Sequence, residues 1–234
     1  MTLRAIFWDT ETTGIKPEKD RIIEIAAYDP VRNRSFEKFV NPGCPIPKEA
    51  SAIHGITDEM VASADSFAKV GQEFIEFCDG EVMLVAHNND AFDIHFLRQE
   101  CNRYQLTLPT WKYFDTLKWA RRYRNDLPRH SLQFLREVYE IPANNAHRAL
   151  DDVIVLHQVY KYMVDDLIPE QVYQLLNKPK VIQHMPFGKY QGKLLKDVPT
   201  EYFEWLKNSG AFEKPENQEL KEAVLQLSAA ALTA

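Results

Sequence analysis

The stretch that decides the fold is IFWDTETTG, residues 6–14, close to the start of a chain of 234 residues. A short apolar run rich in strand-forming residues ends in Asp9 and Glu11, and Gly14 follows. Two explanations fit a buried strand that delivers two carboxylates: a turn that needs polar residues, or a rigid strand end that holds a metal ion. The choice depends on where the other carboxylates lie.

Composition and charge narrow the class of protein. The chain is 45% hydrophobic and 26% charged, typical of a globular protein, and its length allows one domain-sized core plus an appendage. A net charge of −6 argues against a protein that coats nucleic acid, although a local basic strip could still hold phosphates. The three cysteines have no close pairs, so no disulfide framework or zinc knuckle is indicated. No signal peptide or membrane-length apolar stretch is visible, so we expect a cytoplasmic protein with no membrane partner.

Hydrophobic periodicity predicts an α/β fold. Three early strands are followed by strands that alternate with helices, a pattern typical of a sheet with helices on its faces. The expected strands are 3–8, 21–28, 35–40, 82–86 and 111–114. The expected helices are 66–78, 91–104, one from 116, 131–140 and 149–167. The proline-rich stretch NPGCPIPKEA, residues 41–50, is expected to be a loop.

A change of pattern near Pro169 predicts a second, smaller unit. Proline recurs beyond this point, and the helical periodicity of the preceding segment stops. In the last part of the chain Gly188 and Gly192 bracket a turn, and a helix starts at Pro199. The expected organisation is a first domain over 1–168, a linker helix over 169–180 and a small C-terminal α+β module over 181–234.

Further carboxylates follow other predicted strands. Asp93 lies in AHNNDAFDIHFL, residues 86–97, and Asp151 and Asp152 lie in HRALDDVIVL, residues 147–156. Each cluster alone is explained by the helix dipole, which favours acids in the first turn. Together with the opening stretch, however, they place carboxylates at one edge of one sheet, where they repel unless cations neutralise them. Oxygen ligands without cysteine indicate Mg²⁺ or Mn²⁺, and two such ions can act together on a phosphodiester.

Three motifs in this order, DTETTG at 9–14, AHNNDAFD at 86–93 and HRALDD at 147–152, resemble the DEDD superfamily of 3′–5′ exonucleases. The most similar branch is the DnaQ-like one, which includes the proofreading epsilon subunit of bacterial DNA polymerase III. The resemblance covers about residues 3–165. It implies a ribonuclease H-like fold, a mixed five-stranded sheet flanked by helices. It also implies hydrolysis from 3′ ends to nucleoside 5′-monophosphates, with single-stranded DNA favoured and a role in repair or proofreading.

The same resemblance implies a metal site and a general base. The ligands of two divalent cations, Mg²⁺ with Mn²⁺ as a substitute, would be Asp9, Glu11, Asp93 and Asp152. The family pattern has an alanine three residues before the last ligand, so Ala149 favours Asp152 over Asp151. His147, five residues before Asp152, matches the histidine-type (DEDDh) branch and would be the general base that activates the attacking water. Asp9 would bridge both ions.

The stretch NPGCPIPKEASAIHGITDEM, residues 41–60, also resembles this branch and implies contacts with the terminal nucleotide. The implied substrate contacts are Thr12, Thr13, His54, Gly55, Ile56, His87, Asn88 and Phe92. Structural alternatives stay open for several of them. Ile56 and Phe92 could be plain core, Gly55 a turn residue, and His87 a brace for its loop.

Two basic regions are candidates for holding phosphates. Between residues 118 and 136 there is one acid and a run of cations with aromatic neighbours, either a single-strand track or a solvated helix face. Those cations are Lys118, Arg121, Arg122, Arg124, Arg129 and Arg136. The C-terminal PFGKYxG stretch resembles a small module found beside such nuclease domains. Its Lys189, Tyr190 and Lys193 either grip a strand or serve solubility.

Rival functions remain at this stage. A ribonuclease of the same fold, acting on RNA tails or oligoribonucleotides, differs by recognition of the 2′-hydroxyl, which no residue decides. A non-catalytic binding module is disfavoured, because a site that had lost its activity would have no physical reason to keep four mutually repelling carboxylates and His147. A polymerase accessory subunit is also possible, but the nearest clamp-binding candidate, residues 226–228, continues into alanines. A homodimer is compatible with the sequence, although no apolar stripe demands one.

Overall fold

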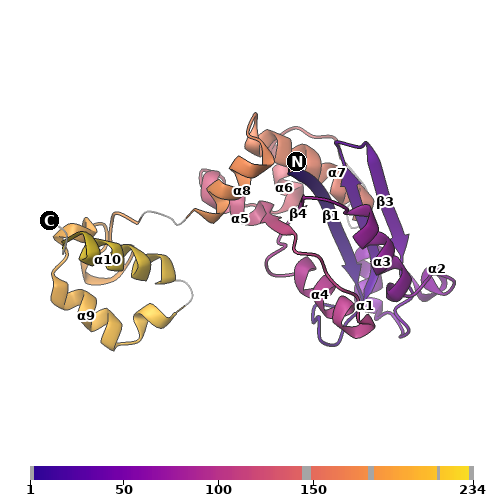
Figure 1. The fold of residues 1–234 in the computed structure, drawn as a ribbon, viewed down its shortest axis with the longest axis horizontal. Helices are drawn as coiled ribbons and strands as arrows, with labels where there is room; N and C mark the ends of the chain where they lie inside the picture. The colour runs from indigo at the N-terminus through magenta and orange to yellow at the C-terminus, as the bar shows by residue number, and fades with distance from the viewer. Residues whose placement is uncertain (1–2, 144–148, 179–181, 215–216, 232–234) are drawn as a thin grey trace. The chain divides into compact units, whose positions relative to one another are not determined.

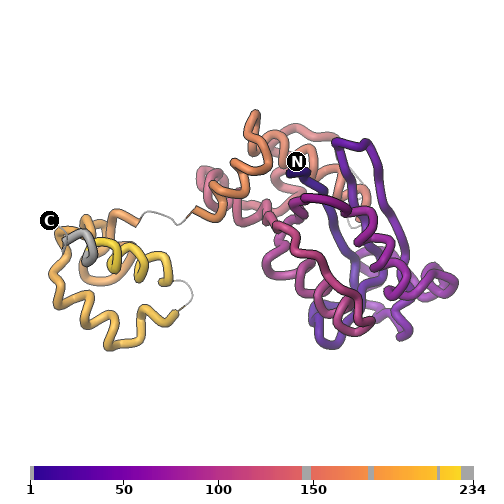
Figure 2. Tube along the Cα trace, viewed as in Figure 1, coloured from indigo at the N-terminus to yellow at the C-terminus, as the bar shows by residue number. Residues whose placement is uncertain are grey.

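The computed structural model describes residues 3–143, 149–178, 182–214 and 217–231, the last four by their backbone alone. The chain divides into two compact units, residues 1–176 and 177–234, and Figure 2 follows the trace through each. Among the helices described, none combines the length and apolar character needed to cross a membrane.

The first unit is built on a mixed five-stranded sheet with the order β3-β2-β1-β4-β5 (Figure 1). Strands β1 and β2 and strands β2 and β3 pair antiparallel, whereas β4 pairs parallel with both β1 and β5. The strands are β1 Arg4–Thr12, β2 Ile22–Asp29, β3 Arg34–Phe39, β4 Val82–Ala86 and β5 Lys112–Asp115. This arrangement confirms the expected ribonuclease H-like sheet.

Strand β1 is longer than the sequence pattern predicts, because it continues through the carboxylates instead of ending before them. Asp9 lies opposite Ala26 of β2, and Glu11 lies opposite Glu24. The pairing shifts between Glu11 and Thr12, where the strand leaves the sheet. Strand β4 pairs with β1 from Arg4 to Phe7, and β2 pairs with it from Phe7 onward, so the backbone under the carboxylates is held in the sheet by β2.

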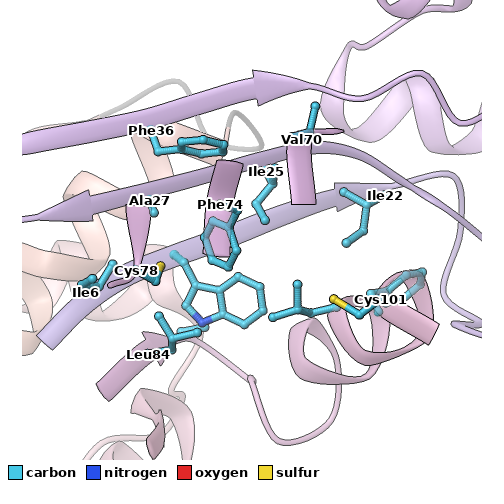
Figure 3. Close-up of a cluster of buried hydrophobic side chains, with 14 of the residues drawn as sticks. Ile6, Ile22, Ile25, Ala27, Phe36, Val70, Phe74, Cys78, Leu84 and Cys101 are labelled. Atoms are coloured by element: carbon cyan, nitrogen blue, oxygen red, sulfur yellow. The ribbon is translucent and has the colours of Figure 1, made fainter. Parts of the chain in front are cut away.

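Helices cover both faces of the sheet, which explains why β1 begins as an almost continuous apolar run. One face carries Ile6 and Trp8 and packs against α3 and α4 (Figure 3). The other face carries Phe7 and packs against α7. The helices of the first unit are α1 Lys48–His54, α2 Asp58–Val61, α3 Phe67–Phe77, α4 Asp93–Tyr104, α5 Thr116–Tyr123, α6 Leu132–Val138, α7 Ala149–Val164 and α8 Pro169–Asn177.

Helix α8 coincides with most of the expected linker and packs on the first unit. Val172 and Leu176 are buried in the core beneath α7. Arg122 Nη1 donates to the carbonyl of Leu176 at 3.0 Å, and Tyr123 donates to that of Leu175 at 3.1 Å. The first unit therefore extends through Leu176, beyond the change of pattern near Pro169.

The second unit is helical in its described part. Instead of the strands expected for an α+β module, it has one isolated antiparallel bridge between His184 and Leu194. Met185, Leu206 and Phe212 are buried in its own small core. Its elements are the 3₁₀ turns η1 Gly188–Tyr190, η2 Leu195–Asp197 and η3 Ala211–Glu213, and the helices α9 Thr200–Asn208 and α10 Gln218–Ala231.

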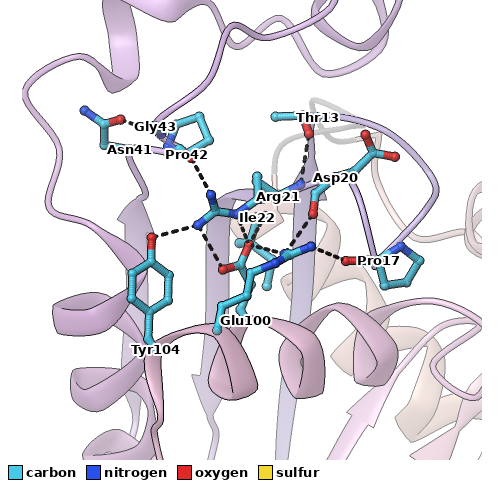
Figure 4. Close-up of polar contacts among 11 residues, drawn as sticks. Thr13, Pro17, Asp20, Arg21, Ile22, Asn41, Pro42, Gly43, Glu100 and Tyr104 are labelled. Carbon is cyan, nitrogen blue, oxygen red and sulfur yellow. Dashed lines mark hydrogen bonds and ion pairs between the residues drawn. The ribbon is translucent and has the colours of Figure 1, made fainter.

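A buried hydrogen-bond network ties the loop that follows β1 to α4 (Figure 4). Oε1 of the buried Glu100 accepts from Arg21 Nε at 2.7 Å and from Arg103 Nη1 at 3.1 Å. Arg103 Nη2 also donates to the carbonyl of Pro17 at 2.6 Å, and the backbone N–H of Arg21 donates to Thr13 Oγ1 at 2.9 Å. The loop is therefore fixed against the helix that carries the next expected metal ligand.

Replacing Arg21 by alanine should lower the free energy of unfolding by about 3 kcal/mol, because it leaves the Glu100 carboxylate buried without its closest cation. Chemical denaturation measures this change. Arg32→Ala is the matched control, since Arg32 pairs with the exposed Asp79 on the surface and its loss should cost much less. An Arg21→Ala protein with the free energy of unfolding of the parent would show that the network does not stabilise the fold.

Candidate metal and catalytic site

Three carboxylates meet where β1 leaves the sheet. Ligand oxygens of Asp9, Glu11 and Asp152 all lie within 4.8 Å of one another. Asp9 and Glu11 alternate along β1 with Thr10 and therefore point to the face covered by α7, whose first turn carries Asp152. Asp151, in the same turn, is not part of the group. An all-oxygen donor set of this kind fits a hard divalent cation such as Mg²⁺ or Mn²⁺.

The fourth expected ligand, Asp93, reaches the same strand from the other face. It is the first residue of α4 and is 2% exposed. Its Oδ1 accepts a hydrogen bond from Thr10 Oγ1 at 2.8 Å. Asp93 therefore adjoins the group of three carboxylates without belonging to it, and the end of β1 lies between ligands supplied by α7 and α4.

The raised pKa values of two of these carboxyl groups show how unfavourable it is to ionise them all so close together. Burial raises the pKa of Asp9 well above its usual range, and the neighbouring carboxylates raise it further. In decreasing order of effect, these neighbours are Asp93, Glu11, Asp152 and Glu24. Burial also raises the pKa of Asp93 to about 7, although the hydrogen bond from Thr10 acts in the opposite direction. A bound cation would relieve both effects, because it favours the ionised carboxylates.

A chain of hydrogen bonds that the sequence does not reveal supports Asp152. Gln133 of α6 donates from Nε2 to Asp152 Oδ1 at 3.1 Å. Arg136, one helical turn further, donates from Nε to Gln133 Oε1 at 2.8 Å and from Nη1 to the carbonyl of Ile141 at 2.9 Å. Gln133 is thereby fixed in one amide orientation, so it restricts where the Asp152 carboxylate can point.

Glu24 is a fifth carboxylate that sequence analysis missed. It lies on β2 opposite Glu11 and is 1% exposed. Its Oε2 accepts from the backbone N–H of Ala149, the first residue of α7, at 3.2 Å. It therefore fixes the start of the helix that carries Asp152. The signal in the sequence was a lone acid inside the apolar strand RIIEIAAY.

A pocket of about 560 Å³ adjoins the carboxylates, with Glu11 in its wall. The expected contacts Thr12, Thr13, His54 and Phe92 also line it. The hydroxyls of both threonines are used inside the loop, since Thr12 Oγ1 donates to the carbonyl of Gly14 at 2.6 Å and Thr13 Oγ1 accepts from the backbone of Arg21. A residue larger than glycine at position 14 would displace the Asp20 side chain, because its Cβ would lie 2.4 Å from Asp20 Oδ2.

Ile56, one of the implied substrate contacts, takes the alternative that the sequence left open and lies in the core. Ile56 is fully buried in a small core with Ile23 and Val61, so it does not reach the pocket. Gly55 ends α1 in the left-handed conformation, with a φ of 73°, and acts as a turn residue. The apolar side chains that line the pocket and face solvent are instead Ile15, 78% exposed, and Ile53, 63% exposed.

His87 and Asn88 lie on the loop between β4 and α4, where the structure gives them bracing contacts. His87 Nδ1 is 2.9 Å from Thr116 Oγ1, and burial lowers the pKa of His87 to about 4. The backbone N–H groups of Asn88 and Asp90 both donate to the Asp115 carboxylate at 3.0 Å. Asp115 caps α5 as well, so this one side chain fixes the loop that leads to Asp93.

The basic strip between residues 118 and 136 is largely engaged with the protein itself. Arg124 makes a bidentate ion pair with Asp126, in which Nε and Nη2 each lie 3.0 Å from a carboxylate oxygen. Lys118 Nζ lies 3.1 Å from Asp90 Oδ2. Arg136 supports Gln133, as described above. Arg121 and Arg129 have no ion pair with any residue in the described ranges. The remaining expected catalytic residue, His147, lies outside the described residues.

Comparison with known proteins places the chain in a family. The family model described as Exonuclease matches residues 6–160, most of the first unit. The chain belongs to this exonuclease family. A second family model, which its description assigns provisionally to a quorum-sensing-regulated virulence factor, matches residues 173–233.

Relatives of this exonuclease-family chain include polymerase subunits. The DNA polymerase III epsilon subunit of Treponema pallidum is 36% identical over 162 residues, which cover 67% of this chain and 74% of that protein. Exonuclease DPD1 of Arabidopsis thaliana is 35% identical over 70% of this chain and 57% of its own length. The PolC-type DNA polymerase III of Caldanaerobacter subterraneus is 34% identical over 69% of this chain, but over only 12% of its own length. The chain thus spans only part of the last two relatives.

Solved structures share the fold. The zinc-bound complex of E. coli exonuclease I with single-stranded DNA superposes with a TM-score of 0.61 and 22% identity, over 69% of this chain and 40% of that one. Exonuclease X in complex with 5′-overhanging duplex DNA gives a TM-score of 0.56 and 26% identity, over 74% of this chain and 99% of that one. The exonuclease domain thus forms the first unit.

The raised pKa values predict that a higher pH lowers the melting temperature of the metal-free protein and enlarges the increase in melting temperature that Mg²⁺ causes. A carboxyl whose pKa in the folded state is raised from 3.8 to about 7 stabilises the fold at low pH and loses this contribution as the pH rises through 7. In EDTA the melting temperature should therefore fall as the pH rises from about 4 to about 7, and the increase on adding Mg²⁺ should grow over the same range.

Thermal denaturation with Asp93→Asn checks this prediction, because this substitution should flatten the fall in EDTA. Asp79→Asn is the control, since Asp79 is an exposed acid whose pKa is lowered by Arg32, and it should leave the fall unchanged. A fall of the same size in Asp93→Asn would show that other groups cause it.

Gln133→Ala should weaken the affinity for Mn²⁺ roughly tenfold, because loss of a group that orients a ligand typically costs 10- to 100-fold. Calorimetric titration with Mn²⁺ measures the change. Gln72→Ala is the matched control, since the exposed Gln72 donates to Glu76 on the surface of α3, and the Mn²⁺ affinity of this variant should equal that of the parent.

Proposed function

We propose that this protein is a 3′–5′ exonuclease that releases nucleoside 5′-monophosphates from single-stranded DNA. The observation that carries the proposal is the convergence of Asp9, Glu11 and Asp152 beside a pocket of about 560 Å³, a size typical of small-molecule and cofactor sites. Membership of the exonuclease family and the relatives named above support the reaction type. The exonuclease I complex supports a single-stranded DNA substrate, by analogy.

The residues that would hold two divalent cations are Asp9, Glu11, Asp93 and Asp152. When bound, such cations offset the charge that develops on the phosphate and on the leaving oxygen. The protein holds the ligands in place before substrate arrives, through Thr10 for Asp93 and through Gln133 for Asp152. Such preorganisation lowers the cost of reaching the reactive geometry.

The pocket would bind the terminal nucleoside. Ile15 and Ile53 offer apolar surface to the faces of a base, and Phe92 adds an aromatic wall. The loop from Thr12 to Gly14 would meet the sugar through its backbone or through the O–H of Thr13, because the Thr12 hydroxyl already donates to Gly14 and that of Thr13 only accepts. Apolar contacts with the faces of a base do not distinguish one base from another, so this arrangement suits an enzyme that removes any nucleotide.

His147 is the proposed general base. It precedes Ala149 by two residues, and the N–H of Ala149 is held by Glu24. A histidine at this place would take the proton of the attacking water, while the phosphodiester bond to the departing strand breaks. The leaving oxygen then takes a proton from solvent.

We also infer that the enzyme acts without a polymerase partner. The segment considered as a clamp-binding peptide begins with Gln226, which lies within helix α10 and is not part of an extended tail. Gln226 and Leu227 line a pocket of the second unit itself. Copurification of a polymerase with the full chain would contradict this inference.

Asp9→Ala should abolish hydrolysis, because it removes the ligand that would bridge the two cations. The parent should shorten 5′-labelled single-stranded DNA from its 3′ end in Mg²⁺ or Mn²⁺ but not in EDTA, as a ladder on a denaturing gel. His147→Ala should be slower by about 10²- to 10⁴-fold.

An RNA of the same sequence and a duplex, incubated in parallel, test which substrate the enzyme prefers. Faster shortening of RNA would replace the deoxyribonuclease proposal with a ribonuclease, and no metal-dependent shortening would reject both.

The double substitution Ile15→Ala/Ile53→Ala should raise KM about tenfold with a smaller change in kcat, since each lost side chain removes roughly 1.5 kcal/mol of apolar burial at most. Initial rates on a short oligonucleotide measure both constants. Val31→Ala, an equally exposed apolar residue outside the pocket, is the control and should leave KM unchanged. A parental KM in the double variant would place the terminal base elsewhere.

A further inference from the structure

The second unit differs from the first in charge. Residues 177–234 carry eight lysines and seven acids, whereas the whole chain has a net charge of −6. The excess is local, because residues 171–196 contain five lysines and no acid. A stretch of this kind attracts phosphates.

Three aromatic rings form a continuous run beside these lysines. Tyr190 of η1 meets Tyr202 of α9 edge to face, with centroids 4.8 Å apart and an interplanar angle of 76°. Tyr202 is stacked on Trp205, one helical turn further, at 5.5 Å and 20°. Trp205 is 58% exposed, so the run ends in an indole with a free face. An exposed ring supported by other rings is a platform on which a nucleic-acid base can stack.

Two lysines accompany the first ring of this run. Lys189 Nζ lies 5.4 Å from the centroid of Tyr190, and Lys193 Nζ lies 5.6 Å from it. Both side chains are exposed, and neither pairs with a carboxylate in the described part of the chain. By contrast, Lys221 of the same unit pairs with Glu213 at 3.0 Å. Lys189 and Lys193 are therefore available for phosphates.

The glycines of PFGKYQG fix these groups in place. Gly188 has a φ of 76°, and a Cβ there would lie 2.4 Å from the hydroxyl oxygen of Tyr202. Glycine is thus required for the turn to approach α9 closely enough to bring Tyr190 against Tyr202. The turn is closed by Met185, whose N–H donates to the carbonyl of Lys193 at 2.7 Å and whose carbonyl accepts from Gly192 at 2.8 Å. The motif therefore builds the surface in advance of binding.

We propose that the second unit binds single-stranded nucleic acid on the surface formed by Lys189, Tyr190, Lys193, Tyr202 and Trp205. Stacking on Trp205 needs a free base face, which a duplex hides within its stack. Glu201 and Glu204 are exposed on α9, so the phosphates lie on the lysine side of the rings. This binding site goes beyond the proposed hydrolysis and does not depend on it.

The test uses the full chain in EDTA, where hydrolysis is stopped, and the fluorescence anisotropy of a labelled oligothymidylate. Trp205→Ala should weaken binding by roughly fivefold or more, the loss expected for one stacked base. Lys189→Ala/Lys193→Ala should weaken binding and reduce the slope of log Kd against log salt by about 1.4, or about 0.7 for each phosphate. Trp205→Phe should retain most of the affinity, and it keeps the test valid if the alanine variant unfolds.

Two control variants match these changes. Lys221→Ala removes a charge from the same unit, and Tyr162→Ala removes an exposed ring from the first unit. Both should bind as the parent does. The proposal is overturned if the tryptophan and double-lysine variants keep the parental affinity. It is also overturned if only the lysine variant binds more weakly, because a charge effect alone needs no ring platform.

Hydrolysis of a labelled dinucleotide in Mg²⁺ separates this proposal from the exonuclease activity. A dinucleotide occupies one site at a time, so the surface variants should hydrolyse it at the parental rate. A parent that shortens neither the dinucleotide nor a longer strand in Mg²⁺, with binding still sensitive to Trp205→Ala, would reject the exonuclease proposal and leave this one standing.

Discussion

Repulsion among carboxylates at the end of β1 is the constraint on which the rest of the structure depends. Asp9 and Glu11 come from the strand, Asp152 from α7 and Asp93 from α4, and their charges oppose one another. Left to themselves, such side chains would separate and turn to solvent. The fold prevents this by burying the strand on both faces and by fixing the start of each helix.

The supports are distributed over the sequence. Glu24 of β2 fixes the first residue of α7, and Gln133 of α6 orients Asp152. Asp115, the last residue of β5, fixes the loop that leads into α4. Each support is a polar side chain bonded to a backbone group or to a ligand. The hydrophobic core stabilises the fold, and these few hydrogen bonds fix the positions of the carboxylates.

Strong local patterns made the main elements predictable. The apolar runs at 3–8 and 82–86 marked strands that lie in the centre of the sheet, and the acids that follow them gave Asp9, Glu11 and Asp93. What could not be predicted depended on partners far along the chain. β1 continues to Thr12 because β2 pairs with it there. Gln133 is unremarkable until Asp152, 19 residues later, is placed beside it.

Local sequence indicates where a glycine makes a turn, but it does not indicate which residues the turn packs against. Ile56 stands in a stretch that suggests substrate contact, but the turn at Gly55 directs it into a small core, and Ile15 and Ile53 take the exposed positions. Gly188 and Gly192 bracket the expected turn, and Gly188 allows this 3₁₀ turn to lie close to Tyr202, a partner that the local sequence does not indicate. In both cases glycine was recognised correctly as a turn, and the partner of the turn was missing.

The alternation of side chains along β1 has a consequence for how this strand can evolve. Asp9 and Glu11 face α7 while Thr10 faces α4, and the pairing with β2 and β4 fixes this assignment. Moving the strand by one residue would exchange the two sets, pointing a hydroxyl at Asp152 and both acids at the wrong helix. The apolar part of β1 can therefore accept other apolar residues over time, whereas the length of this segment cannot change by a single residue without loss of the site.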